Sequence, residues 1–475
     1  MNRFFSNIQP IHYRPDAGPE DTLVFRHYNP GEIIHGKPML EWFKFAVCNF
    51  NTFRYMGGDD YYGDRVHMRH RDWEDHHMDR SGSGGQNNSY HGWGGYMFGG
   101  EGDGKSIESY KQRMRASFEF YHKLGVKFYT ASDRDFAPDC DNWEETNRFL
   151  EEMTSMACDL QKQVGVRPLY FSADLFTHPR YMNGAAASPD ANIFAYACAQ
   201  VKRAMDMAKR LNAENFVFFN PRDGYQHTYM RHMFRDMSHM ANMYRMALQY
   251  KDKIGFRGQL LIQPKPMDPR RHQYESDAMA TMHLLRYFGL DRRYKLYIKP
   301  AWSCIMSRRY EHDVYMSSAY NMLGMVGASD SYMEINATSD IHARDVRHST
   351  HVMKCVMEQG GLYQGGFVLD GRCRRESWEP RDLFHGHVLT MDTYARALKN
   401  AARMVSDAVF AKNLQQRYIT YKTGFGERMD KGNTNFEECE AHIRKHGEPQ
   451  QHSARYEHFD QMFNFYIYPQ SAPRR

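Results

Sequence analysis

The chain has 475 residues, of which 41% are apolar and 25% charged, a composition typical of a globular protein. The net charge of +5 is small for this length. Basic residues form short clusters, such as Arg372 to Arg375, that we interpret as solvated faces or partner contacts. The charge pattern therefore does not indicate a nucleic-acid-binding protein. No stretch approaches the roughly 18 apolar residues of a membrane-spanning helix.

In chain order, an N-terminal arm over residues 1–40 is followed by short apolar runs that alternate with longer segments of helical periodicity. Phe194, Ala197, Cys198 and Val201 show the spacing of a helix that lies on a sheet. The apolar runs predict strands at 43–50, 127–133, 168–176, 215–220, 259–263, 295–300, 331–336 and 363–369. The periodic segments predict helices at 107–125, 142–164, 192–211, 228–250, 277–287, 310–323, 348–358 and 387–409.

The alternation predicts an α/β protein with a closed (β/α)₈ TIM barrel. An open doubly wound sheet is the alternative, although no G-x-G-x-x-G motif follows the first strand. We assign residues 1–410 to the barrel with its arm and residues 411–475 to a C-terminal extension. The extension is polar and interrupted by glycines, so we expect it to pack on a neighbouring subunit.

Residues 59–104 differ from the rest of the chain in composition and read as an insertion in the barrel. They combine a glycine- and aromatic-rich stretch with several acidic residues. They also contain histidines at five positions, His67, His70, His76, His77 and His91. Such a set can bind a metal ion, or it can form a solvated or partner-facing loop; both interpretations stay open, and the role of the insertion is not resolved.

Several ordered motifs resemble those of the xylose isomerase family over most of the chain. They include Arg180 to Ala185, Pro264-Lys265-Pro266-Met267, His272-Gln273-Tyr274 and Gly365-Gly366 to Asp370. The resemblance implies a barrel whose active site lies at the carboxyl ends of the strands. It also implies two divalent cations, usually magnesium, manganese or cobalt, that are held by carboxylates during an aldose–ketose isomerisation.

The positions that match the family's metal ligands carry the wrong residues for this task. They are Gln263, Lys299, Trp302, Glu334, Asp345, Arg347 and Asp370. Three carboxylates now face two side-chain cations, so the net charge changes from −6 in the family to −1 here. We therefore predict that the metals are lost and that no cofactor is bound. Lys299 is expected to form an ion pair with Glu334 or Asp370, and Lys299→Ala is expected to destabilise the barrel.

The positions that match the family's sugar-binding residues have also changed. Ser132 stands at the position of the ring-opening histidine, so Asp135, which orients that histidine in the family, has nothing left to orient. Phe50 and Phe219 match the positions of substrate-stacking tryptophans. Lys265 is retained, and we interpret it as half of an ion pair rather than as a catalytic group.

From these losses we predict a pseudoenzyme, not an enzyme, that serves as a structural subunit of a homo-oligomer or of a larger assembly. Two alternatives remain. The first is an active metal-dependent aldose–ketose isomerase, and the second is a non-catalytic module that binds a sugar or a sugar phosphate. The sequence identifies neither the partner nor the assembly.

The cysteines bear on the compartment. Eight are present, none forms a Cys-x-x-Cys pair, and their spacing is irregular, which favours free thiols in a reducing environment. No secretory signal opens the chain, and Arg3 and Arg14 precede the first acidic residue, Asp16. We therefore expect an intracellular protein of the cytoplasm or the mitochondrial matrix, without distinguishing the two.

Overall fold

The computed structural model describes residues 4–54, 106–267, 270–332, 337–373, 377 and 379–468. The insertion at 59–104, with the histidines discussed above, lies outside the described residues. Glu334, Arg374 and Arg375 also lie outside them.

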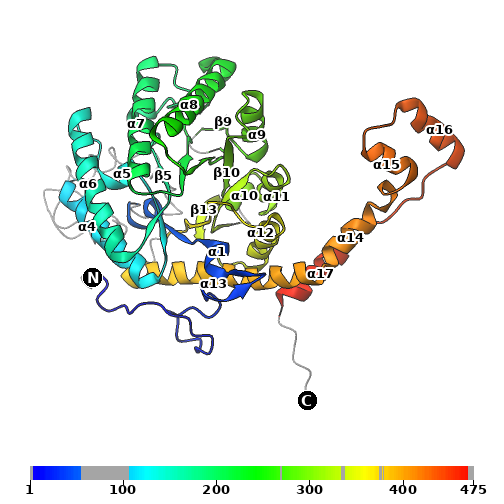
Figure 1. Cartoon of the computed structure of the whole chain (residues 1–475), viewed down its shortest axis with the longest axis horizontal. Helices are drawn as coiled ribbons and strands as arrows, with labels where there is room; N and C mark the ends of the chain where they lie inside the picture. The colour runs from blue at the N-terminus through cyan, green and yellow to red at the C-terminus, as the bar shows by residue number, and fades with distance from the viewer. Residues whose placement is uncertain are drawn as a thin grey trace.

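The predicted TIM barrel is confirmed: parallel strands in the described residues close into one barrel (Figure 1). Its strands follow one another in chain order, and the last pairs with the first. They are β3 (Ala46–Cys48), β4 (Phe128–Ser132), β5 (Arg167–Ser172), β6 (Asn215–Phe218), β8 (Gln259–Ile262), β10 (Tyr294–Ile298), β11 (Leu323–Gly327) and β14 (Phe367–Leu369).

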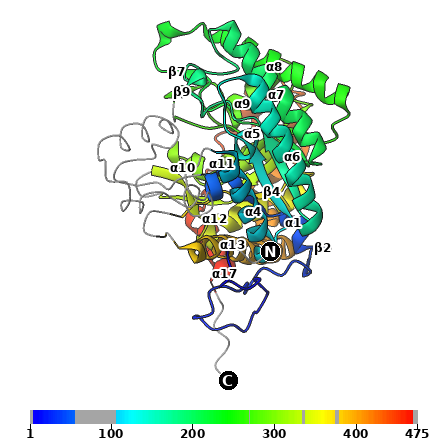
Figure 2. The same cartoon turned by 90° about the vertical axis from the view of Figure 1, so that its left-hand side faces the viewer.

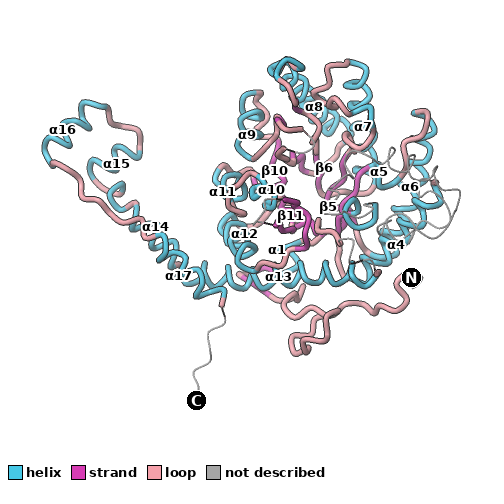
Figure 3. The backbone as a smooth tube through the Cα atoms, turned by 180° about the vertical axis from the view of Figure 1, so that it is seen from behind, coloured by secondary structure: helices cyan, strands magenta, loops and turns pink. Residues whose placement is uncertain are grey.

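The strands form because each is a short, buried, apolar run whose alternate residues fill the barrel interior. Leu169, Val217, Leu261 and Met325 belong to this inner core and are fully or almost fully buried. The helices surround the strands (Figure 3), and a second and larger apolar core is made of buried residues from both. The barrel is therefore packed through its centre, and space for a ligand is left only at a mouth.

The surrounding helices lie close to the predicted ranges. They are α4 (Ile107–Leu124), α6 (Trp143–Val164), α7 (Ala191–Arg210), α8 (Met233–Ile254), α9 (Ala278–Tyr287), α11 (His312–Ala319), α12 (Val346–Gln359) and α13 (Pro380–Asp407). Their ends follow local chemistry. The Ser106 hydroxyl accepts from the Ser109 N–H to begin α4, and Gly125, at φ 80°, ends that helix.

The prediction that 331–336 forms the seventh barrel strand is wrong: residues 331 and 332 lie in a separate two-stranded sheet, and residues 333–336 lie outside the described residues. The seventh barrel strand is β11, which lies within and after the segment predicted as a helix at 310–323. An antiparallel hairpin of β12 (Ser329–Tyr332) and β13 (Ala337–His342) follows it. Glycine is unfavourable in a strand, so the glycines of β11 kept this segment from being predicted as a strand. Here Gly324 is needed, because a Cβ atom would lie 2.6 Å from Leu261 Cδ2.

Short elements complete the barrel. On the N-terminal side and in the loops these are β1 (Ile33–Ile34), β2 (Lys37–Pro38), α1 (Met39–Phe43), the π-helix η1 (Phe50–Arg54), α5 (Asp133–Phe136), β7 (Gly224–Tyr225), β9 (His272–Gln273) and α10 (Pro300–Ile305). The N-terminal arm runs along the side of the barrel where α13 lies (Figures 1 and 2). Lys123 of α4 anchors it by donating from Nζ to the carbonyl oxygens of Phe5 and Ile8 at 2.6 Å each.

After α13 the chain leaves the barrel as an arm and returns (Figure 1). Its helices are α14 (Val409–Arg417), α15 (Gly424–Asp430), α16 (Phe436–His446) and α17 (Tyr456–Ile467). The returning helix α17 buries Phe463, Tyr466 and Ile467 with Met404 of α13. Over the described residues, no helix combines the length and the apolar character that a bilayer crossing requires.

Candidate active site

A cavity of about 320 Å³ opens at the carboxyl ends of the barrel strands. Residues that end a strand or follow it directly line much of its wall; these are Cys48, Ser132, Ser172, Phe219, Gln263, Lys299 and Asp370. Such a volume lies within the range of small-molecule sites. The structure thus brings many of the predicted site residues into one cavity, at the end of the barrel where TIM-barrel enzymes hold their substrates.

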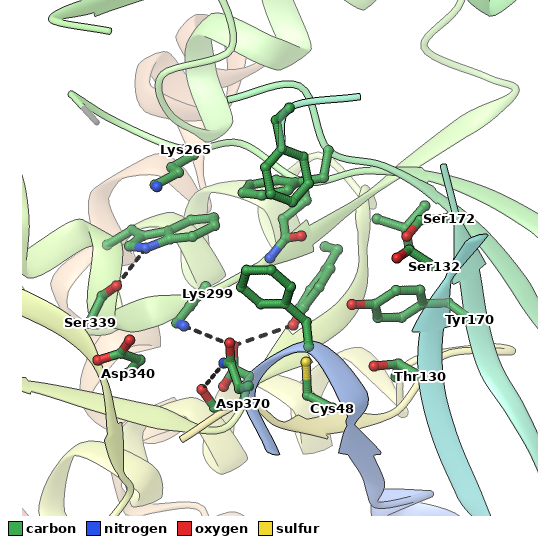
Figure 4. Close-up of a pocket in the computed structure, with 18 of the residues that line it drawn as sticks. Cys48, Thr130, Ser132, Tyr170, Ser172, Lys265, Lys299, Ser339, Asp340 and Asp370 are labelled. Carbon is green, nitrogen blue, oxygen red and sulfur yellow. Dashed lines mark hydrogen bonds and ion pairs between the residues drawn. The ribbon is translucent and has the colours of Figure 1, made fainter. Parts of the chain in front are cut away.

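The polar floor of this cavity is an ion pair between Lys299 and Asp370 (Figure 4). Lys299 follows β10 and precedes α10, while Asp370 follows β14. The Lys299 Nζ atom lies 3.0 Å from Asp370 Oδ2, and both side chains are buried. The Tyr297 hydroxyl donates to the same oxygen at 3.5 Å. Asp370 is thus one of the two partners predicted for Lys299. The other, Glu334, lies outside the described residues.

Gly327, the last residue of β11, makes room for this pair. A Cβ atom at Gly327 would lie 2.9 Å from Asp370 Oδ2 and 3.1 Å from Lys299 Cγ. A side chain at Gly327 would therefore have to displace Asp370 or Lys299 from its present position. The lysine side chain fills the space that a longer residue would need.

The residues around Lys299 do not suit a two-metal site. Divalent cations of the magnesium type require several oxygen ligands, and carboxylates must balance their charge. A dication about 4 Å from an ammonium group would be repelled by roughly 8 kcal/mol at an effective dielectric constant near 20. That cost is about the whole binding energy of a micromolar site. Asp370 offsets part of this repulsion, but a single carboxylate beside Lys299 does not supply the several oxygen ligands that such an ion requires.

Two predicted ligand positions lie away from the cavity. Asp345 caps α12, where its Oδ1 atom accepts from the backbone N–H groups of Arg347 and His348. The Arg347 guanidinium instead binds Asp460 and Asn464 of α17. The assignment of Asp345 and Arg347 to the former metal site is therefore wrong. Asp345 begins α12, and Arg347 secures the returning helix of the C-terminal extension.

One wall of the cavity is aromatic. Phe219 stacks on Trp302 with ring centroids 5.8 Å apart and planes 10° from parallel. Phe176 and Phe50 continue the wall through edge-to-face contacts. The Trp302 indole donates from Nε1 to the Ser339 hydroxyl at 2.7 Å, which fixes the ring. A planar apolar wall opposite a polar floor suits a ligand that has one apolar face and several hydroxyl groups.

Two lysines flank the indole ring that is bonded to Ser339 (Figure 4). The Nζ atoms of Lys265 and Lys299 lie 5.8 and 5.4 Å from its centroid, within cation–π range. Lys265 is positioned by the loop after β8, where its backbone N–H donates to the Glu275 carbonyl oxygen at 2.9 Å. Burial raises the pKa of the Glu275 carboxyl to about 8.

Arg54, which pattern analysis missed, organises the side of the cavity near β4. Its guanidinium lies 3.3 Å from Asp135 Oδ1 and 2.6 Å from Asp174 Oδ2. Asp135 also accepts from the backbone and hydroxyl of Ser132, at 2.6 and 3.1 Å. Burial raises the pKa of Asp135, and Arg54 partly opposes that rise. The expectation that Asp135 has nothing to orient is wrong, because it holds Arg54 and the start of α5.

A second missed pair joins Arg372, after β14, to Asp340 of β13. Both side chains are buried and both line the cavity. Arg372 belongs to the basic cluster that we interpreted as a solvated face or a partner contact, and for this residue that interpretation is wrong. The signal was present in the sequence, since Arg372 lies two residues after Asp370, but its acidic partner lies in a hairpin that was not predicted.

Curated relatives match almost the whole chain. A xylose isomerase of Arabidopsis thaliana is 36% identical over 97% of this chain and 90% of its own length. Xylose isomerases of Caldanaerobacter subterraneus subsp. yonseiensis and Rhodopirellula baltica are 34% and 35% identical, each over 98% of this chain and 99% of the relative. The chain belongs to the xylose isomerase family. The expected resemblance is thereby confirmed.

Two further comparisons add detail to this xylose isomerase family member. Residues 414–467 match the model of the XylA2 C-terminal domain. Among solved structures, a xylose isomerase domain protein from Alicyclobacillus acidocaldarius has a TM-score of 0.44 and 10% identity, covering 61% of this chain and 94% of that one.

The prediction that the chain is not an enzyme is contradicted by these relatives. Several curated proteins named xylose isomerase share about a third of their residues with it over nearly their whole length, which points to an enzyme. The altered residues at the positions that match the family's metal ligands were too narrow a basis for predicting loss of activity, because they do not exclude catalysis by other groups in the cavity.

Proposed function

We propose that the chain is an aldose–ketose isomerase that acts on a small sugar, such as xylose, in the cavity at the barrel mouth. The observation that carries this proposal is its near-full-length identity of 34–36% to xylose isomerases, together with a cavity at the expected end of the barrel.

The lining of the cavity supports a sugar as the ligand. The stacked rings of Phe219 and Trp302 offer an apolar surface to the C–H face of a sugar. Lys299, Asp370 and Gln263 offer donors and acceptors to its hydroxyl groups. Small-molecule sites usually combine an apolar wall with a few polar groups, and these polar groups fix the orientation of the ligand.

The conversion also needs charged groups at the reacting oxygens. During an aldose–ketose isomerisation, negative charge develops on the carbonyl oxygen, and the neighbouring hydroxyl loses its proton. Fixed cations stabilise such charge strongly in a site that excludes water. Lys299 supplies a cation at the cavity floor, and Asp370 supplies a carboxylate beside it.

The test is conversion of D-xylose to D-xylulose by the purified full chain, with D-glucose and related aldoses in parallel. Each sugar is assayed in EDTA and again with magnesium, manganese or cobalt. We expect ketose from at least one aldose, and we expect Trp302→Ala to lose most of that activity. Absence of ketose under every condition from protein with an intact thermal transition would overturn the proposal.

We also infer that a second copy of the chain packs against the C-terminal arm. The described residues of α15 and α16 include no buried side chain, yet they carry exposed apolar residues such as Phe436 and Ile443. We expect light scattering to give a dimer or larger species, and Phe436→Glu with Ile443→Glu to lower the mass. Glu440→Lys, on the same helix, is the control. A wild-type monomer would contradict the inference.

A further inference from the structure

The ion pair at the cavity floor has an unused acceptor. Asp370 is 3% exposed, and its Oδ2 atom meets Lys299 and Tyr297. No donor among the described residues reaches its Oδ1 atom. A buried carboxylate oxygen without a donor is unfavourable and therefore rare in native proteins. Since Asp370 lines the cavity, a hydroxyl group of a bound ligand can satisfy this oxygen.

Lys299 offers matching donors. An ammonium group has three N–H donors, and Asp370 requires only one of them. Its side chain is held in place by the space at Gly327 and by the face of the Trp302 ring, 5.4 Å from Nζ. The ammonium is thus a fixed cation at the floor of a cavity with an aromatic wall.

On the other side of the cavity, Asp135 Oδ1 accepts no hydrogen bond but lies 3.3 Å from Arg54 Nε, and the Asp174 carboxylate has no spare acceptor. Asp174 Oδ1 accepts from the backbone N–H groups of Phe176 and Thr177, at 3.2 and 2.9 Å. Its Oδ2 atom accepts from Arg54 at 2.6 Å and from the Thr177 hydroxyl at 2.7 Å. Both oxygens of this carboxylate are therefore satisfied by the protein, which indicates a structural role.

We propose that the Lys299–Asp370 pair replaces the family's divalent cations as the group that binds the reacting oxygens of the sugar. Lys299 donates to the carbonyl oxygen O1, and Asp370 Oδ1 accepts from the hydroxyl on C2. This inference rests on the proposed isomerase function and adds that recognition and catalysis need no metal ion.

The Lys299–Asp370 pair can also donate and accept the protons that move during the reaction. As the C2–H bond breaks, its electron pair and hydrogen move to C1, and O1 takes a proton from the Lys299 ammonium. The C2 hydroxyl gives its proton to Asp370, so that C2 becomes the ketose carbonyl. Lys299 is then a neutral amine and Asp370 a carboxylic acid. Rotation of the Asp370 carboxyl group then brings its proton to the place of Oδ2, the oxygen that lies 3.0 Å from Lys299 Nζ, and transfer of that proton to Nζ restores the starting state.

The first experiment measures binding of xylitol, a polyol without a carbonyl group, to the wild-type full chain by calorimetry. We expect the same Kd, within about twofold, in EDTA and in millimolar Mn²⁺. A parallel Mn²⁺ titration is expected to show no tight site. Binding of xylitol that appears only with Mn²⁺ would overturn the inference, and so would tight binding of Mn²⁺ that EDTA reverses.

The second experiment uses matched lysine variants, one within β10 and one directly after it. Lys299→Met is expected to weaken xylitol binding by about tenfold or more, because it removes a charge-assisted hydrogen bond. Lys295→Met is the control, since its Nζ atom binds the Asn321 carbonyl oxygen away from the cavity lining. Asp370→Asn, which keeps the shape of the side chain, covers the case in which Lys299→Met does not fold. Unchanged binding in folded Lys299→Met or in Asp370→Asn would overturn the inference.

The two proposals fail in different ways. Turnover of xylose that requires Mn²⁺ would refute the metal-free pair but leave the isomerase function standing. Metal-free binding of xylitol without turnover of any aldose would refute the isomerase function and leave the sugar subsite at Lys299 standing.

Discussion

The barrel mouth has two charged sides, and on each a cation is paired with a carboxylate. The sides differ in whether protein donors satisfy the carboxylate oxygens. On the side of β4 and β5, Arg54 lies between Asp135 and Asp174, and the Asp174 carboxylate is fully satisfied by protein donors. On the side of β10 and β14, Lys299 meets Asp370, which keeps one oxygen without a donor in the described residues. A carboxylate whose oxygens are all satisfied by the protein, such as Asp174, stabilises the fold. An oxygen that neither a donor nor a cation of the described residues reaches, such as Asp370 Oδ1, indicates where a ligand can bind.

The largest effect is expected from Arg54→Met. Removing the guanidinium leaves two buried carboxylates, Asp135 and Asp174, facing each other without a cation. Breaking a buried pair in this way costs about 4 kcal/mol, so the free energy of unfolding should fall by that amount in a denaturant titration. A variant as stable as the wild type would show that the network contributes nothing.

Lys299→Met should cost somewhat less, about 3 kcal/mol, because it leaves one buried carboxylate without a cation, whereas Arg54→Met leaves two. The double variant Lys299→Met with Asp370→Leu removes both charges and is expected to recover at least half of that loss. Activity should stay lost in both. If the double variant is no more stable than Lys299→Met, the loss does not come from an unpaired carboxylate.

A smaller effect is expected in the pH dependence of stability. It arises from Glu275, whose backbone carbonyl accepts from the Lys265 N–H. Burial raises the pKa of Glu275 from 4.5 to about 8, so the folded state holds this proton while the unfolded chain releases it. The contribution of Glu275 to stability is therefore complete below about pH 4.5 and declines as the pH rises toward 8, by roughly 4 kcal/mol. Thermal melts at several pH values should show that Glu275→Gln flattens this decline. An unchanged pH dependence would exclude Glu275 as its source.

The smallest effect is expected from Phe219→Ala. The change removes part of the stacking wall but no charged group, so it should weaken ground-state and transition-state binding alike. We expect KM to rise roughly fivefold while kcat changes little, in line with the modest energy of aromatic contacts. A large fall in kcat at constant KM would assign the ring a part in the reaction itself.

The barrel could be predicted because its strands and helices repeat local patterns of apolar residues. The seventh strand could not, since Gly324 and Gly327 weaken the strand signal and are explained only by neighbouring side chains. The hairpin of β12 and β13 was not predicted either, so residues that follow it were matched to the wrong positions.

The candidate site was predicted best where residues directly follow strands. Lys299 and Asp370 are of this kind, and their ion pair was among the expected contacts. Arg54 was missed because it follows β3 within a π-helix, and the carboxylates that it binds are distant in sequence. The same holds for Arg347, whose partners on α17 are more than a hundred residues away and which was therefore placed in the wrong site.

The most direct test of metal-free catalysis by Lys299 and Asp370 is turnover of xylose deuterated at C2, followed by NMR in buffer freed of divalent cations with EDTA. The account predicts xylulose that carries the deuterium on C1, formed at a rate that added manganese does not raise. Xylulose that forms only after manganese is restored would contradict it.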